Sequence, residues 1–176
     1  GYYVKYVVLD TSEITNIPQH RERIYILGFL DKYLYDTINL EFEKIDNKSI
    51  TEFVEDNSKI NKKYYYTDKL KVYNTIKNAI TKRNMIYQYR RFYVRENKNG
   101  KCPTLTSNMG SGGHNVPLIM DETDGIRKLT PRECFNLQGF SIDYKFPKGM
   151  SDNNLYKLIG NAVSIPVIEL IITKFI

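Results

Sequence analysis

Residues 128–140 read KLTPRECFNLQGF and carry a nearly complete set of signals for a short helix that ends in a turn. Thr130 and Glu133 have the spacing of a capping box, in which the two residues satisfy each other's free backbone N–H groups. Pro131 suits the first helical position, and Gly139 lies where a left-handed residue closes a helix. The stretch therefore predicts a capped helix between Thr130 and Gly139.

Two further helices are expected after this stretch. The first begins near residue 151 and stops at Gly160, inside the sequence LIGNAVS at 158–164. The second begins near residues 164–166, and its apolar side chains recur at helical spacing, which predicts one buried face. The residues expected on that face are Val167, Ile168, Ile171, Ile172 and Phe175.

The first 30 residues predict two strands. Val4–Leu9 is a β-branched apolar run, typical of a buried strand, and Ile24–Phe29 is a second one. Thr11–Gln19 is expected to be the loop between them.

The middle of the chain has weaker signals. It is polar and irregular up to residue 62, with a short helix expected from Ser49, an N-cap candidate, to Val54. Thr67 can cap another helix, and a turn is expected at 97–100. The apolar face of that helix would hold Leu70, Tyr73, Ile76 and Ile80. The strands expected around the turn are Gln88–Val94, Thr104–Asn108 and Val116–Met120.

Three segments together resemble signature motifs of the cytosine-C5 DNA methyltransferases. Residues 128–140 and the GNAV sequence at 160–163 are similar to the last two motifs of that family, close to RxLTPRECxRLQGF and GNAV. Residues 17–29, IPQHRERIYILGF, resemble its IPQxRxR strand. The three motifs stand in the family's order, which argues against chance similarity. The resemblance covers nearly the whole chain, although the middle matches at only a few points.

Other motifs of that family have no counterpart in this sequence. The Gly-rich loop for S-adenosylmethionine, the Pro-Cys of the nucleophile and a Glu-Asn-Val are absent: Cys102-Pro103 has the reverse order, and Glu96-Asn97 leads into lysine. Gly110–Gly113 follows no buried strand and opens no helix. We therefore expect the C-terminal part of an enzyme, inactive by itself, that is either an excised fragment or one subunit of a split methyltransferase.

The resemblance implies a mixed α/β chain shared between two domains. Residues 1–30 would supply edge strands of a Rossmann-like methyltransferase domain. Residues 31–150 would form a small, β-rich target-recognition domain. Residues 151–176 would be C-terminal helices that return to the catalytic domain.

The positive charge is concentrated in one window. The formal net charge is +6, and residues 82–101 alone hold seven basic residues and one acid, with four aromatic residues interleaved. This pattern is typical of a surface that follows phosphates, and arginine suits that task better than lysine. The alternative is a solvated lysine-rich surface. Two distant cysteines without a signal peptide fit a bacterial cytoplasm, and the apolar run at Ile165–Ile176 is too short to span a bilayer.

Candidate catalytic residues lie in the IPQHRER segment. Gln19, Arg21 and Arg23 would share one side of an extended chain, because side chains alternate along it. The resemblance assigns Arg23 to O2 of a flipped cytosine, and it assigns Arg21 and Gln19 to holding the surrounding loops and the base. The alternative is an ordinary ion pair of an arginine with Glu13 or Glu22.

Candidate cofactor-binding residues lie in the GNAV turn. Gly160 permits a left-handed turn, after which Asn161 presents its amide beside a helix N-terminus, where a carboxylate is favoured. In the family, this asparagine and the next residue contact the methionine carboxylate of S-adenosylmethionine. The resemblance therefore implies Asn161 and Ala162 as cofactor-binding residues, and the alternative is a simple turn between two helices.

Candidate DNA-binding residues lie between the basic window and the capped helix. Thr104-Leu105 resembles the Thr-Leu pair of the family's recognition domain, although such a pair is common by chance. The glycine-rich loop after it can approach base edges closely, because glycine adds no side chain. The residues expected to contact DNA are Gln88, Arg90, Arg91, Arg95, Thr104, Ser107, Asn108, Gly110, Gly112, Gly113, His114 and Asn115.

Other reactive residue types are expected to have structural roles. Glu133 is occupied by capping, and Cys134 lies on an apolar helix face. Cys102 precedes its proline, whereas the family nucleophile follows one. His20 and His114 are too isolated to hold a metal, so none is expected.

We interpret the sequence as the C-terminal portion of a bacterial DNA (cytosine-5-)-methyltransferase of restriction–modification type. The family's chemistry is base flipping, thiolate attack at C6, and methyl transfer from S-adenosylmethionine to C5. The expected partners are double-stranded DNA with a flipped cytosine and the N-terminal catalytic part. A non-catalytic DNA-binding module is the alternative from another class, although it needs neither the IPQHRER segment nor the GNAV turn. A relative that acts on RNA stays open, as does the target sequence.

Overall fold

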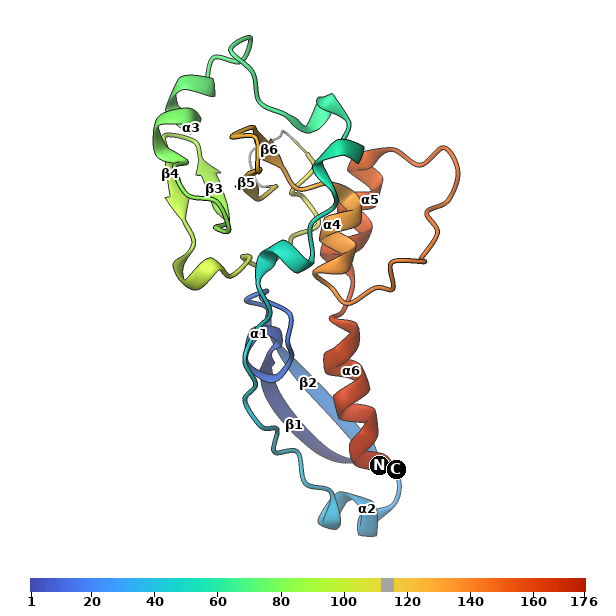
Figure 1. Ribbon diagram of the computed structural model, residues 1–176. Coiled ribbons are helices and arrows are strands. Elements are labelled where there is room, and N and C mark those ends of the chain that lie inside the picture. Colours follow the sequence, from blue (N-terminus) through green and yellow to red (C-terminus); the bar gives the residue numbers. More distant parts are fainter. Residues whose placement is uncertain (112–115) are drawn as a thin grey trace.

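Two sheets organise the chain in the computed structural model, which describes residues 1–111 and 116–176 (Figure 1). One end of the elongated molecule holds a two-stranded hairpin, and the other end holds a four-stranded sheet with several short helices. The prediction of a mixed α/β chain is confirmed.

The hairpin pairs β1 (Tyr3–Asp10) with β2 (Glu22–Phe29) in antiparallel register, from Tyr3 opposite Phe29 to Asp10 opposite Glu22. Both predicted strands are present, but the first is not buried as expected, because Val4, Tyr6 and Val8 on one of its faces are exposed. The predicted loop between them begins as a one-turn helix, α1 (Thr11–Ile14), because the Asp10 side chain accepts a hydrogen bond from the backbone N–H of Ser12.

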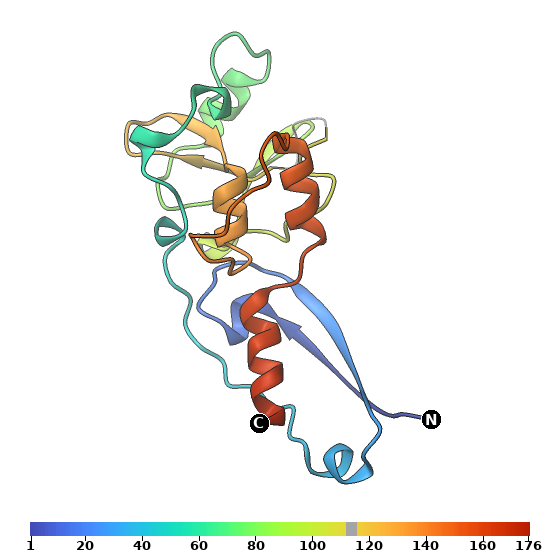
Figure 2. The same ribbon diagram turned by 90° about the vertical axis from the view of Figure 1, so that its right-hand side faces the viewer.

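Helix α6 (Ile165–Ile172) covers one face of this hairpin, and Figure 2 shows it lying along the strands. Val167 and Ile171 are buried against Leu9 and Ile14. The predicted buried face is therefore only partly correct, because a hairpin covers a single stripe of the helix. Ile172 and Phe175 are exposed, and Ile168 is half-buried. Phe175 lies in a short 3-10 turn, η5 (Thr173–Phe175).

The second sheet has the strand order β4-β3-β5-β6, with all neighbours antiparallel. The single strand predicted over Gln88–Val94 is wrong, because the chain reverses at Arg91, whose φ is 52°. Thr104–Asn108 forms no strand, and β6 was not expected because its three residues are too few to show alternation. The strands are β3 (Tyr87–Arg90), β4 (Tyr93–Glu96), β5 (Leu118–Met120) and β6 (Ile126–Lys128).

Short helices connect the two sheets. Ser49 caps a 3-10 turn rather than a longer helix, and α3 (Tyr73–Ala79) starts six residues after Thr67, without a side-chain cap. Leu70 is consequently exposed, while Ile76 and Ile80 are buried under β3 as predicted. The remaining short elements are α2 (Lys32–Thr37), η1 (Ile50–Glu52), η2 (Asn57–Lys59), η3 (Lys62–Tyr64) and η4 (Lys98–Gly100).

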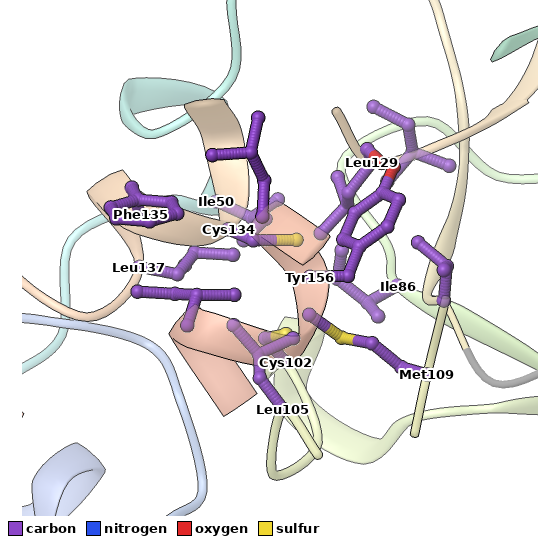
Figure 3. Close-up of a cluster of buried hydrophobic side chains, with 14 of the residues drawn as sticks. Ile50, Ile86, Cys102, Leu105, Met109, Leu129, Cys134, Phe135, Leu137 and Tyr156 are labelled. Atoms are coloured by element: carbon purple, nitrogen blue, oxygen red, sulfur yellow. Dashed lines mark hydrogen bonds between the residues drawn. The ribbon is translucent and has the colours of Figure 1, made fainter. Parts of the chain in front are cut away.

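Helices α4 (Pro131–Asn136) and α5 (Asp152–Asn161) pack together in the largest hydrophobic cluster (Figure 3). The capping box of α4 is present as predicted, and Gly139 has the expected positive φ of 83°. Cys134, Leu105 and Tyr156 meet in this cluster, so α5 packs against the middle of the chain, whereas α6 packs against the hairpin. The proposed domain boundaries at residues 30 and 150 stay predictions.

The segment Asp152–Phe175 is long and apolar enough to cross a membrane by length and composition. The fold divides it, because α5 ends at Asn161 and the backbone of Ala162 and Ser164 is extended before α6 begins. Each of the two helices buries an apolar face within the protein.

Candidate functional site

Arg21 lies at the point where the hairpin meets the rest of the molecule. Its side chain is only 4% exposed. Nη1 donates to the carbonyl of Leu105 at 2.9 Å, and Nη2 donates to the carbonyls of Gly160 at 3.3 Å and Ala162 at 2.6 Å. Burial, followed by the nearby Arg23 cation, lowers the pKa of Arg21 to about 10. The guanidinium therefore stays charged at neutral pH and holds two distant turns together.

Two glutamines complete this arrangement. Nε2 of Gln19 donates to the Leu137 carbonyl at 2.6 Å and to Oε1 of Gln138 at 3.1 Å. Nε2 of Gln138 in turn donates to the carbonyl of Ile159 at 3.1 Å. We call the buried side chains of Gln19, Arg21 and Gln138 the junction. It joins the three motif segments, 17–29, 128–140 and 160–163, to the Thr104-Leu105 pair.

Gly160 allows the close approach on which the junction depends. A Cβ at this position would lie 2.2 Å from the backbone carbon of Thr106 and 2.3 Å from the nitrogen of Ser107. The left-handed turn expected here is wrong, because Gly160 is a residue of α5 and does not have a positive φ. The glycine is needed for close contact between two backbones.

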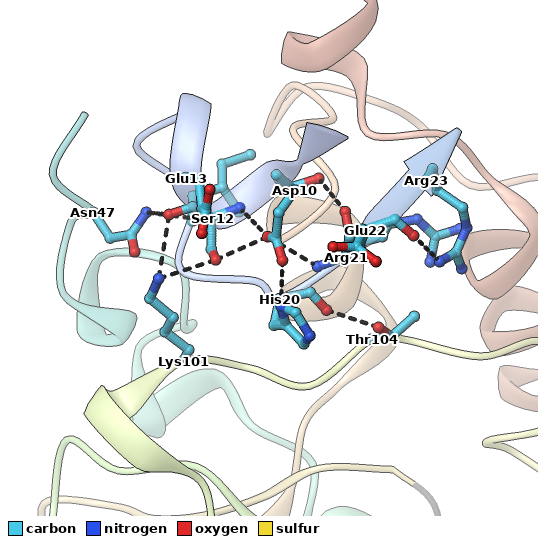
Figure 4. Close-up of polar contacts among 12 residues, drawn as sticks. Asp10, Ser12, Glu13, His20, Arg21, Glu22, Arg23, Asn47, Lys101 and Thr104 are labelled. Atoms are coloured by element: carbon cyan, nitrogen blue, oxygen red, sulfur yellow. Dashed lines mark hydrogen bonds and ion pairs between the residues drawn. The ribbon is translucent and has the colours of Figure 1, made fainter. Parts of the chain in front are cut away.

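Asp10 fixes the segment that leads into the junction (Figure 4). Its Oδ1 accepts hydrogen bonds from Ser12 N at 2.8 Å and from Arg21 N at 3.3 Å, and its other oxygen pairs with His20. Thr104 Oγ1 donates to the His20 carbonyl at 2.7 Å, and Lys101 Nζ donates to Ser12 Oγ at 3.0 Å. The loop after β1 is therefore tied to the segment 101–104.

Arg23 differs from Arg21, although only one residue separates them. It is exposed, and in the part of the chain that the structure describes its Nη1 donates only to the neighbouring Glu22 carbonyl, at 2.6 Å. Within residues 1–111 and 116–176 it forms no ion pair with Glu13 or Glu22, and Glu13 pairs instead with Lys44 at 3.1 Å. The salt-bridge alternative for Arg23 therefore finds no support in the geometry, and its guanidinium is available to a ligand.

The GNAV turn presents donors beside α6. Asn161 is the last residue of α5 and is exposed, while Ala162 is half-buried and its carbonyl is held by Arg21. Ser164, the N-cap of α6, has a buried hydroxyl without a hydrogen-bond partner among the described residues. An exposed amide close to a helix N-terminus can bind a carboxylate, and the assignment of Asn161 and Ala162 to S-adenosylmethionine stays a prediction.

An open cleft of about 620 Å³ lies between the loop at His20 and the β3–β4 hairpin. In the hairpin register Gln88 lies opposite Arg95, and Arg90 lies opposite Tyr93. These residues share the face of the hairpin that points away from its buried tyrosines. Five of the residues predicted to bind DNA line the cleft, namely Gln88, Arg90, Arg95, Thr104 and Asn108.

The other predicted DNA-binding residues lie elsewhere. Arg91 forms the hairpin turn, and Ser107 packs near Gly160. Gly110 packs on α5, where a Cβ would lie 2.9 Å from the Tyr156 ring, so it serves packing. Gly112, Gly113, His114 and Asn115 lie outside the residues that the structure describes.

Several residues that line the cleft were not predicted from the sequence. The basic window 82–101 signalled Lys98 and Lys101 as phosphate ligands, but nothing in the sequence placed His20 across from them. Lys98 and Lys101 line the cleft. The polar lining residues that the sequence did not predict are His20, Asn97, Asn99 and Thr106.

Glu133 is structural, as predicted. It forms a fully buried pair with Arg127, with N–O distances of 2.7 and 2.8 Å, and it also accepts hydrogen bonds from the backbone of Thr130 and Glu55. Cys102 and Cys134 are buried, and burial raises the pKa of both thiols, so neither forms a reactive thiolate. No three potential ligands among the described residues lie close enough together to hold a metal ion.

The sequence matches known proteins over its whole length. The family described as C-5 cytosine-specific DNA methylase matches residues 1–176. Type II methyltransferase M.Bsp6I of Bacillus sp. (strain RFL6) is 47% identical over 96% of this chain and 53% of its own length. Type II methyltransferase M.NgoBI of Neisseria gonorrhoeae is 31% identical over 96% of this chain and 49% of its own length. The chain thus spans about half the length of these relatives.

The fold is similar to that of solved methyltransferases. The Entamoeba histolytica methyltransferase EhMeth aligns with a TM-score of 0.71 at 17% identity, over 98% of this chain and 53% of that protein. The S. pombe Dnmt2 methyltransferase aligns with a TM-score of 0.66 at 17% identity, over 98% of this chain and 55% of that protein. At this level of identity the likeness concerns the fold alone.

Proposed function

The chain belongs to the C-5 cytosine-specific DNA methylases, and from this premise we propose that it is the C-terminal portion of a restriction–modification methyltransferase. In this proposal it recognises the DNA target and supplies one side of the cytosine and S-adenosylmethionine sites. The hairpin and α6 are the edge of a Rossmann-like catalytic domain, and the four-stranded sheet with its helices is the target-recognition domain. The enzyme acts in the bacterial cytoplasm.

The junction is the observation that carries this proposal. Arg21 bonds at once to the Leu105 carbonyl beside the cleft and to the Gly160 and Ala162 carbonyls of the GNAV turn. A DNA-binding module needs no such link between a cleft and a turn suited to a carboxylate. An enzyme that must align a base with a methyl donor does need it, because small misplacements of reacting groups cost large factors in rate.

Each arginine of the IPQHRER segment then has its own task. Arg21 and Gln19 are positioning residues. Both terminal nitrogens of Arg21 donate to backbone carbonyls, and Nε2 of Gln19 donates to the Leu137 carbonyl and to the Gln138 side chain. Arg23 has exposed donors and a permanent charge, so it can bind O2 of the extruded cytosine and stabilise negative charge on the ring.

Asn161 and Ala162 would hold the methionine carboxylate of S-adenosylmethionine, which supplies the methyl group when bound. The Asn161 amide donates, and the N-terminus of α6 adds its positive end. Neither cysteine of this chain can serve as nucleophile, because both thiols are buried. The nucleophile therefore comes from the additional half that the relatives possess.

The outer face of the hairpin supports such a second half. On the side away from α6, the strands expose a row of apolar side chains, whereas a stable free surface rarely carries so large a continuous apolar patch. We infer that the N-terminal catalytic part covers this face. The exposed residues are Val4, Tyr6, Val8, Ile24 and Ile26.

Methyl transfer from labelled S-adenosylmethionine to DNA tests the proposal. The isolated chain should transfer no label, and adding the N-terminal half of the protein should restore transfer to cytosine C5. Turnover by the chain alone would contradict the assignment of the missing parts. DNA binding by the reconstituted protein without any transfer would instead support a non-catalytic module. Preference for a structured RNA over duplex DNA in competition would point to an RNA substrate.

A further inference from the structure

Phe92 occupies an unusual position for a large apolar side chain. It lies at the tip of the β3–β4 hairpin and is 88% exposed, while the neighbouring Tyr89 of the same hairpin is buried. Other strongly exposed apolar residues, such as Tyr6 and Ile26, belong to the continuous face of the β1–β2 hairpin. Phe92 is not part of that face, so burial against the N-terminal half does not explain its exposure.

The hairpin holds Phe92 in a fixed place. Ile76 of α3 and Ile80, which follows that helix, pack under the buried rings of Tyr87 and Tyr89. The Tyr89 hydroxyl donates to the Arg91 carbonyl at 2.7 Å, inside the turn itself. A ring presented by an anchored turn loses little conformational entropy when it meets a ligand.

The surroundings of Phe92 indicate the nature of that ligand. Arg90 and Arg91 are exposed at the tip and Arg95 is exposed nearer the base of the hairpin, and the described residues contain no carboxylate paired with any of them. The one acid of the hairpin, Glu96, lies at its base and pairs with Lys82 at 2.9 Å. A partner that lies along this hairpin must therefore offer negative charge for three guanidinium groups and a flat apolar surface for the one ring at the tip.

Nucleic-acid bases flanked by phosphates offer both features. Base–aromatic stacking is strong and tolerates any base, and apolar wedges inserted at base steps unstack and bend a duplex. The cleft is lined by Gln88, Arg90 and Arg95 of the same hairpin, and Arg90 precedes Phe92 by two residues. DNA that follows the cleft would thus pass over Phe92.

We propose that Phe92 packs its ring against bases of the target duplex and stabilises the locally unstacked DNA from which the cytosine is extruded. The inference rests on the proposed function, and it adds a side chain that acts on DNA shape to the polar residues that read base edges. Because such a wedge acts on a deformable base step, it contributes to sequence preference without a base-specific hydrogen bond.

The test uses the full-length protein and a synthetic duplex that contains the site methylated by the wild type. 2-Aminopurine replaces, one at a time, the bases next to the target cytosine, and its fluorescence rises when the base unstacks. Phe92→Ala should lower the fluorescence rise and weaken binding about 5- to 150-fold, the range expected for one stacked base. Phe92→Trp should keep both, and Phe92→Leu should be intermediate.

Ile142→Ala is the matched control, since Ile142 is 77% exposed on the loop after α4 and does not line the cleft. It should leave binding and fluorescence unchanged. If Phe92→Ala behaves like this control while the wild type methylates normally, the wedge is refuted and the proposed function stands. A wild-type protein that neither binds nor methylates DNA would refute the proposed function itself. Equal melting temperatures of the variants would show that folding does not cause the effect.

Discussion

The junction and the cleft use the same residue types in opposite ways. In the junction, Gln19 and Arg21 are buried, and the amide nitrogen of Gln19 and both terminal nitrogens of Arg21 donate to protein carbonyls. In the cleft, Arg90 and Arg95 are exposed on a hairpin face that borders an open volume of about 620 Å³. A buried donor without an acceptor is costly, whereas an exposed one is satisfied by water until a ligand replaces it. The junction therefore stabilises the fold, and the cleft is left for binding.

The largest effect should come from opening the junction. Arg21→Met removes the donor of three carbonyls in a buried site, and we expect a loss of about 3–5 kcal/mol of stability. Chemical denaturation of the full-length protein measures it. The matched control is Arg23→Met, which changes an exposed arginine of the same strand region and should cost less than ~0.5 kcal/mol. Equal losses of stability for the two variants would show that Arg21 and Arg23 do not differ in their contribution to the fold.

The second-largest expected effect concerns the catalytic role of Arg23. Arg23→Ala should lower the rate of methyl transfer by about a hundredfold or more, because it removes a preorganised donor to the charged ring. DNA affinity and melting temperature should change little. Single-turnover methylation and binding by fluorescence anisotropy separate the two quantities. A variant that is unstable but has normal turnover would instead assign Arg23 to the fold.

The third effect concerns base reading in the cleft. Arg90→Ala and Asn108→Ala should each lose about 1–3 kcal/mol of discrimination at one position of the target, with no loss of stability. Sequencing of the methylated sites measures it. Exchanging residues 82–120 for the segment of a relative with another target is the stronger form of the test. An active hybrid that still methylates the original site would place specificity outside the cleft.

A fourth, smaller effect should distinguish two lysines of the basic window by the salt dependence of DNA binding. Lys98 lines the cleft, whereas Lys82 pairs with Glu96. Lys98→Ala should weaken binding to every DNA alike and reduce the slope of log affinity against log salt by about 0.9. Lys82→Ala should change that slope less, although both lysines belong to the same sequence pattern. Identical salt slopes for the two variants would show that a position in the cleft does not decide which lysine contacts phosphate.

The smallest expected effect concerns a buried carboxylate, that of Asp121, whose contribution to stability should depend on pH, unlike that of the exposed cleft residues. Burial alone would raise the pKa of Asp121, but hydrogen bonds from Tyr65, Thr123 and Gly125 outweigh it and lower the pKa. The stability from this carboxylate is therefore present above about pH 4 and is lost as the pH falls further. Melting temperatures between pH 6 and 3 should fall less steeply for Asp121→Asn than for the wild type. Melting temperatures that fall in parallel for the variant and the wild type would contradict this contribution of the Asp121 carboxylate.

The fold was predictable where local rules dominate. The capping box of α4, the ends of α5 and the two N-terminal strands follow from side-chain spacing, and the structure confirms them. The middle of the chain was less predictable. The turn at Arg91 lacks the glycine or asparagine that usually marks a two-residue hairpin, so Gln88–Val94 resembled one continuous strand.

The candidate site was predictable by residue type and by family motif, but its geometry was not. The basic window identified the hairpin that borders the cleft, and five of the expected DNA-binding residues lie there. His20 was missed because its role depends on a pairing with Asp10 across a loop. The functions assigned to Arg23, Asn161 and Ala162 stay predictions that the experiments above address.

By itself, the sequence determined the family, the helices with strong caps and the location of the positive charge. These features depend on motifs, on hydrogen bonds within a few residues and on composition. Only the tertiary structure decided that Arg21 is buried while Arg23 is exposed, and that Gly160 serves the approach of Thr106 rather than a left-handed turn. The physical reason is distance along the chain. Arg21 meets the carbonyls of Leu105 and Ala162 across 84 and 141 residues, and such contacts exist only once the path of the whole chain is fixed.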